Sequence, residues 1–188
     1  MAKVTRAGSG REFTVLAEKL KQLEGKSSQS GWFENATYPD GTKVAYIASI
    51  QEYGVPSKSI PPRPFMRPTI AAKQNEWLGI MAKGAKAILK GTMTAEQVMG
   101  LVASQAVADV LVTITEITSP PLSPITLELR AMRRAGVKIT GKTVGEAARK
   151  VAQEGYTTPS VSDKPLIDTN ELYDKMTFRV QDEKGQGS

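Results

Sequence analysis

IPPRPFMRP, at residues 60–68, is the stretch around which the rest of this sequence is arranged. Four of its nine residues are proline, and each proline fixes φ, removes an N–H and pushes the preceding residue into an extended conformation. We therefore expect a stiff, extended strap in which Arg63, Phe65, Met66 and Arg67 have little backbone freedom to lose. The guanidinium groups of Arg63 and Arg67 and the ring of Phe65, held on a rigid backbone, are suited to binding another chain or a phosphate backbone.

The composition indicates a globular protein without the usual catalytic side chains. The chain has 188 residues, of which 40% are hydrophobic and 23% charged, so a folded core of about one domain is expected. It has no cysteine and no histidine, which excludes disulfides, thiol nucleophiles, most zinc sites and every Ser-His arrangement. No pair of carboxylates stands out as catalytic, so we expect neither an enzyme, nor a cofactor, nor a metal site. No apolar run at the N-terminus suggests a signal peptide.

Charge is segregated along the chain, whose net charge is +6 and whose pI is about 9.5. Residues 58–90 and residues 130–150 each carry seven basic residues and one acidic residue. Residues 151–188 carry four basic and seven acidic residues. Such a pattern favours head-to-tail contact between copies or a face turned to a polyanion, although solvated helix faces with scattered lysines give the same counts.

Apolar spacing, turn residues and caps predict an α+β fold, with a small antiparallel sheet and several helices packed on one of its faces. The predicted helices cover residues 11–24, 43–53, 68–91, 94–118, 124–134 and 143–154, with a short helical turn at 168–172. The predicted strands cover 31–37 and 176–180, and we expect them to be neighbours in the sheet. Residues 1–10 and 181–188 are expected to be extended terminal arms on a single domain at 11–180. A basic insert occupies about residues 134–163.

The apolar helix at 94–118 has the length of a membrane span. Ser104, Gln105 and Asp109 interrupt it with polar groups, however. A buried core or interface helix is therefore expected, with no membrane contact.

Residues 136–143, GVKITGKT, match the nucleotide-binding pattern GxxxxGK[ST] through Gly136, Gly141, Lys142 and Thr143. In such a site a buried strand precedes the loop, whose N–H groups hold phosphates. Here the preceding residues are arginine-rich and helical in pattern. A basic loop that leads into a capped helix is the simpler interpretation, with Thr143 as the cap and Glu146 as its partner.

Three blocks of sequence together resemble one family. The first is GWFENATYPDGT at 31–42 followed by VAYIA at 44–48. The second is EYG at 52–54 followed by the strap. The third is KPLIDT at 164–169 followed by Leu172. This series, over about residues 30–180, resembles the tail-completion or neck proteins of tailed bacteriophages, which join head to tail. Asn170 stands where glycine is usual in that family, and the link before Lys164 is longer than typical.

The resemblance implies a structural virion protein without catalysis, assembled in the host cytoplasm and located in the neck of the particle. Its copies would form a ring of about six subunits between the head connector and the tail-tube or tail-terminator proteins, with genomic DNA passing through the lumen. The residues that would contact a neighbouring subunit are Arg63, Phe65, Met66, Arg67, Asp168 and Thr169. The residues that would face DNA or the connector are Arg130, Arg133, Arg134, Lys138 and Lys142.

Two alternatives stay open at the level of sequence. The first is a basic nucleic-acid-binding module, favoured by the pI and by the two basic segments. The second is a nucleotide-binding protein that uses the GKT loop at residues 136–143.

Overall fold

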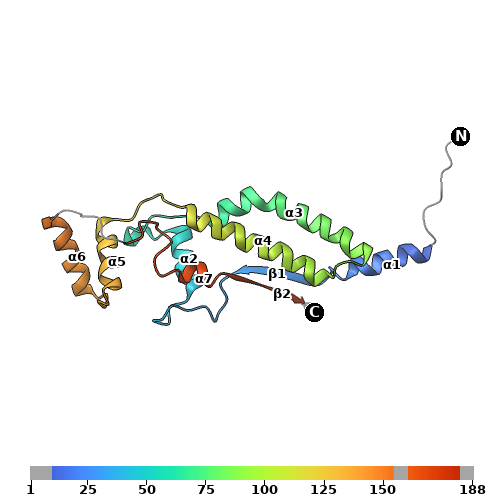
Figure 1. Cartoon of the computed structure of the whole chain (residues 1–188), viewed down its shortest axis with the longest axis horizontal. Coiled ribbons are helices and arrows are strands. Elements are labelled where there is room, and N and C mark those ends of the chain that lie inside the picture. The colour runs from blue at the N-terminus through green and yellow to red at the C-terminus, as the bar shows by residue number, and fades with distance from the viewer. Residues whose placement is uncertain (1–9, 155–160, 183–188) are drawn as a thin grey trace. The chain divides into compact units, whose positions relative to one another are not determined.

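The computed structural model describes residues 10–154 and 161–182 (Figure 1). In order, the elements are α1 (Gly10–Lys21), β1 (Lys26–Gly31), α2 (Val44–Tyr53), the short 3-10 helix η1 (Pro56–Lys58), α3 (Met66–Lys90), α4 (Ala95–Glu116), α5 (Pro124–Arg134), α6 (Gly141–Glu154), α7 (Glu171–Asp174) and β2 (Thr177–Asp182). The expected α+β class is confirmed. The predicted arms at 1–10 and 181–188 lie almost entirely outside the described residues, except that Gly10 begins α1 and residues 181–182 end β2.

The chain folds into two compact units, each built from segments distant in sequence. The first unit contains residues 1–31, 69–109 and 177–188, and the second contains residues 32–68 and 110–176. The domain expected at 11–180 is thus organised as two units, and the strap and all three family-like blocks belong to the second, apart from Gly31.

In the first unit, β1 and β2 form a two-stranded antiparallel sheet in which Lys26 pairs with Asp182 and Gly31 with Thr177. The expected pairing of the first strand with the last is confirmed, but the first strand was wrongly expected at 31–37. Residues 32–43 form turns closed by an isolated bridge between Thr37 and Lys43. The strand lies instead in the polar sequence KSSQSG, whose extended state depends on its pairing with β2 because it has no apolar alternation of its own.

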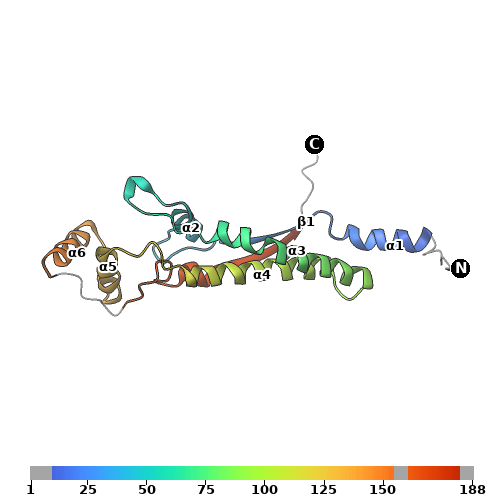
Figure 2. The same ribbon diagram turned by 90° about the horizontal axis from the view of Figure 1, so that it is seen from above.

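The first unit also contains the turn that joins α3 and α4, which run side by side in Figures 1 and 2. Gly91, with φ +75°, ends α3. Thr94 and Gln97 then form the expected capping box, with Thr94 N–H on Gln97 Oε1 at 2.9 Å and Gln97 N–H on Thr94 Oγ1 at 3.2 Å. Ile88 and Val98 are buried across this turn, and Trp77 Nε1 donates to Asp109 Oδ2 at 2.7 Å further along the helices.

Among the described residues, α4 is the one helix whose length and composition would allow it to cross a membrane. Core helices of soluble proteins satisfy the same test. Among the described residues, 28% of its most apolar window is buried.

In the second unit, α5 and α6 pack side by side (Figures 1 and 2). Ser123 caps α5, as expected, by accepting from Thr126 N–H at 3.2 Å. Gly136, with φ +83°, ends α5 in a Schellman motif. The expected cap of α6 at Thr143 is wrong. Thr140 precedes the helix and exchanges hydrogen bonds with Thr143, because the helix begins at Gly141.

Candidate functional site

The strap is held in the second unit by one buried carboxylate, that of Glu52 at the end of α2. Its Oε2 accepts from the N–H groups of Phe65 and Met66 at 2.7 and 2.9 Å, and its Oε1 accepts from that of Arg67 at 3.1 Å. These N–H groups open α3 and have no partner inside the helix. Glu52 therefore caps α3 from another helix and fixes the angle at which the strap becomes helical.

Arg67 completes this clamp from the solvent side. Its Nε donates to Glu52 Oε1 at 2.9 Å and its Nη2 to the Glu52 carbonyl at 3.0 Å, while the guanidinium lies 4.8 Å from the ring centre of Tyr53. Burial alone would raise the pKa of Glu52, but the hydrogen bonds from Met66, Arg67 and Phe65 outweigh it and hold the pKa below its ordinary value.

Gly54 allows the strap to lie against the end of α2. Its φ is +73°, and a Cβ there would stand 2.7 Å from the Pro62 nitrogen and 2.8 Å from the Ile60 oxygen. The EYG sequence is thus a unit, in which the glutamate caps α3 and the glycine leaves room for the strap.

Arg63 ties the strap to the second proline-rich segment. Its N–H donates to the Gln51 carbonyl at 2.7 Å. Its Nε and Nη2 donate to the carbonyls of Pro120 and Pro121 at 2.9 and 3.2 Å. The residue is only 5% exposed, and burial lowers the pKa of its guanidinium, which still carries its charge at neutral pH.

Trp32 joins the three family-like blocks. Its ring meets that of Phe65, which is fully buried, edge to face, with centroids 5.8 Å apart at 88°. Its Nε1 donates to the Leu172 carbonyl at 2.9 Å. One indole therefore contacts the strap and the end of the third block, which lie far apart in sequence.

Arg130 organises the third block. Its Nη1 donates to the carbonyls of Ser162, Lys164 and Ile167 at 2.8, 2.9 and 3.0 Å, and its Nη2 donates to that of Pro165 at 2.8 Å. The residue is 5% exposed. Burial lowers its pKa and the charge of Asp168 opposes that effect. The segment is folded around this guanidinium, since no helix or strand satisfies its carbonyl groups.

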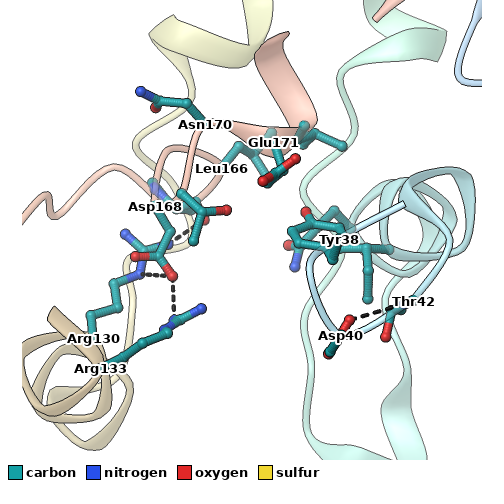
Figure 3. A pocket seen from close by; sticks show the side chains of 14 residues that line it. Tyr38, Asp40, Thr42, Arg130, Arg133, Leu166, Asp168, Asn170 and Glu171 are labelled. Atoms are coloured by element: carbon teal, nitrogen blue, oxygen red, sulfur yellow. Dashed lines mark hydrogen bonds and ion pairs between the residues drawn. The ribbon is translucent and has the colours of Figure 1, made fainter. Parts of the chain in front are cut away.

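A cavity of about 280 Å³ lies beside this cluster, between the loop at residues 38–42, helices α2 and α5 and the third block. In Figure 3, Arg130 and Arg133 reach Asp168 from α5, and Tyr38 lies across the cavity. Burial, followed by the charges of Glu171 and Asp168, raises the pKa of the Tyr38 hydroxyl.

The cavity wall offers an unused hydrogen-bond acceptor. Among the described residues, Gln51 Oε1 is the one buried side-chain nitrogen or oxygen without a hydrogen-bond partner, and Gln51 lines the cavity. Tyr38, Asp40 and Asn170 add further polar groups. The cavity has the size and polarity to receive one or two polar side chains that donate hydrogen bonds.

The expected subunit-contact residues fall into two groups. Arg63 and Phe65 are buried, and Met66 is partly buried with its N–H on Glu52. Their side chains are therefore occupied within the chain. The other three lie nearer the surface. The Arg67 side chain is 57% exposed, while Asp168 and Thr169 line the cavity.

The residues expected to face DNA or the connector are also divided. Arg130 is buried, which corrects its expected position on the surface. Its guanidinium donates hydrogen bonds to backbone carbonyls of its own chain. Arg133 pairs with Asp168 at the cavity. Arg134, Lys138 and Lys142 are exposed on the α5–α6 segment.

Residues 136–143 follow helix α5, and their last three residues, GKT, form the first turn of α6. Gly136 ends α5, Gly141 begins α6, and Thr143 is engaged with Thr140. Lys142 extends into solvent, where its Nζ lies 4.0 Å from Glu146. This is the arrangement expected of a basic loop leading into a capped helix. A phosphate-binding loop would follow a strand.

Sequence reasoning missed two residues that contribute to the site, namely Glu52 and Gln51. Asp168, which the resemblance assigns to a subunit contact, pairs with Arg130 and Arg133 of its own chain. The nearest signal was EYG placed just before a proline strap. Asn170, in the place of the usual glycine, has φ +61°, a conformation that asparagine tolerates better than most residues.

Comparisons with known proteins add no relative. No family model matches the chain, no curated protein resembles it in sequence, and no solved structure matches its fold.

Proposed function

We propose that this chain is a structural subunit of a ring in the neck of a tailed phage particle, where it joins the head connector to the tail. The observation that carries the proposal is the meeting of the three family-like blocks in one unit, where Trp32 contacts Phe65 and Leu172. Residues far apart in sequence thus form one frame, and the series that resembles neck proteins has a single structural purpose.

The chemistry of that frame supports a scaffold. Its buried charged groups, Glu52, Arg63 and Arg130, hold backbone groups in place. Networks of this kind keep a surface rigid, as repeated docking of identical subunits requires.

The test is the assembly state of the purified full-length chain. The expected result is a closed ring in mass photometry and negative-stain images. A six-copy ring of this 20.3 kDa chain has a mass of about 122 kDa. In particles of a phage that encodes the chain, density for it at the junction of head and tail is expected, and deletion of its gene should leave heads and tails unjoined. A strictly monomeric chain, together with particles that join normally without it, would overturn the proposal.

A further inference from the structure

Two exposed helix faces, one on α3 and one on α4, have the same residue spacing. On α3, the outer stripe is Ala71, Asn75, Leu78 and Ala82, and on α4 it is Leu101, Gln105, Ala108 and Val112. Both stripes follow a 4-3-4 spacing, which aligns side chains along one face of a helix. All eight residues are exposed, with Leu78 at 64%, Leu101 at 50% and Val112 at 53%.

The contacts between α3 and α4 within one chain use different residues. Gly84 faces Val98 on the inner side, and Trp77 donates to Asp109. The outer stripes contain none of these four residues, although Gln105 Nε2 donates to Asp109 Oδ1 within α4 at 3.0 Å. Exposed leucine and valine at helix-packing intervals, on a helix of which little is buried, are typical of a surface that packs against another helix.

The net charges of α3 and α4 indicate which helix of one copy packs against which helix of the next. Helix α3 carries five basic residues and one acid, whereas α4 carries three acids and no base. Contact of α3 with α3, or of α4 with α4, would bring like charges together, while contact of α3 with α4 brings opposite charges together. We infer that the outer stripe of α3 in one copy docks on the outer stripe of α4 in the next copy. The inference deepens the proposed ring, on which it rests.

Such a contact joins two different surfaces, so it propagates from copy to copy and closes into a ring if the rotation allows. In a ring whose axis runs along the helices, α3 of one copy is antiparallel to α4 of the next, because the helices are antiparallel within a chain. When the two four-residue stripes are aligned along their full length in this antiparallel orientation, Ala82 lies opposite Leu101 and Ala71 lies opposite Val112. Each pair places a small side chain against a larger one, as close packing of helices needs.

A lipid bilayer is the other surface that could cover an apolar helix. Gln105 in the α4 stripe, Asn75 in the α3 stripe and the exposed Lys86 at the end of α3 favour a protein partner.

The experiment uses one variant for each stripe, Leu78→Asp and Leu101→Asp, in the full chain. Each places an unpaired carboxylate in the contact, which should weaken self-association on the order of 100-fold. Each variant is expected to be monomeric alone by sedimentation velocity. Mixed in equal amounts, the two variants are expected to form heterodimers, since Leu78→Asp keeps the α4 stripe and Leu101→Asp keeps the α3 stripe. No larger assembly is expected, because the other two stripes of the heterodimer carry the substitutions.

Gln153→Asp is the matched control, because it adds the same charge at an exposed position of α6, outside both stripes, and it should assemble like the wild type. Circular dichroism and thermal melting verify folding. Ala82→Glu and Ala108→Glu form a second pair at exposed alanines of the same stripes, in case an aspartate variant does not fold.

The outcomes separate this inference from the proposed ring. If the wild type and either stripe variant both form rings, or if the mixed variants stay monomeric, the stripe contact is wrong and the ring stands. If the wild type itself is monomeric, the stripe contact is wrong, and the proposed ring fails with it if particles that lack the chain also join normally. Sedimentation of the wild type with vesicles of phosphatidylcholine and phosphatidylglycerol, abolished in both stripe variants, would show that lipid covers the stripes and would also overturn the inference.

Discussion

At the scale of single residues, the second unit depends on ionised groups that are buried and fully engaged. Glu52 receives three backbone N–H groups and one guanidinium N–H. Arg130 donates to four carbonyls. A buried charge with all its partners fixes the geometry around it, whereas the loss of one partner leaves polar groups unsatisfied.

Glu52→Gln is expected to lower the free energy of unfolding by about 2–4 kcal/mol at neutral pH, since hydrogen bonds to charged groups are the stronger class. The amide also turns an N–H₂ toward N–H groups that need an acceptor. The folded state holds the pKa of Glu52 below its ordinary value, so its stabilisation is complete above the ordinary pKa and is lost as pH falls through the folded-state pKa.

Urea unfolding at a series of pH values measures this effect. The difference between wild type and variant should be constant near neutrality and shrink in acid. Glu34→Gln, at an exposed glutamate, is the control and should change little at any pH. A constant difference that persists at the lowest pH would contradict the assigned role of the carboxylate.

At the scale of elements, α3 and α4 come together at a glycine. A Cβ on Gly84 would stand 2.3 and 2.8 Å from the two methyl carbons of Val98, so these helices meet more closely than an alanine allows. By contrast, nothing lies within 4 Å of a Cβ on Gly79 in the same helix.

Gly84→Ala is therefore expected to destabilise the protein by about 1–2 kcal/mol, because overpacking outweighs the gain in helix propensity. In a Val98→Ala background the two methyl contacts are removed and only a Cβ contact of 3.1 Å remains, so the same substitution should cost much less. Gly79→Ala, the matched control, should stabilise by about 0.5–1 kcal/mol in either background. Chemical denaturation of all the variants tests this, and an effect of Gly84→Ala that does not depend on residue 98 would exclude the proposed contact.

Sequence patterns predicted most elements because their signals are local. Apolar periodicity indicated the helices, and the caps at Thr94 and Ser123 were confirmed since each needs only residues within one turn. The strand at 26–31 was missed because its six residues are polar and extended only through pairing with β2. The cap of α6 was misplaced by one turn because Thr140 and Thr143 both suit the position.

At the scale of the whole molecule, the basic segments do not act as one surface. Arg63 and Arg130 are internal supports, whereas Arg134, Lys138 and Lys142 remain exposed. If DNA passes through the proposed ring, these three residues on the α5–α6 segment are the ones from the predicted set that the structure exposes along this segment.

The triple variant Arg134→Ala, Lys138→Ala, Lys142→Ala is expected to weaken duplex DNA binding. The slope of log K against log salt should fall by up to about 0.9 for each phosphate that the variant no longer neutralises. The control is Lys21→Ala, Lys43→Ala, Lys58→Ala, which removes the same net charge at exposed positions outside α3 and the α5–α6 segment. Fluorescence anisotropy across a salt series measures both. Equal reductions in the two triple variants would show that net charge alone attracts DNA.

The sequence alone determined the helices, most of their ends and the α+β class, because each depends on neighbours along the chain. The strap was wrongly expected to be extended through Pro68, since α3 begins at Met66, where Glu52 caps it. Tertiary structure alone decided that Glu52 caps α3, that Arg130 gathers the third block and that Trp32 joins the family-like blocks. It also decided which basic residues are buried. A buried charge takes its role from partners brought near by folding, and the residue types by themselves do not specify those partners.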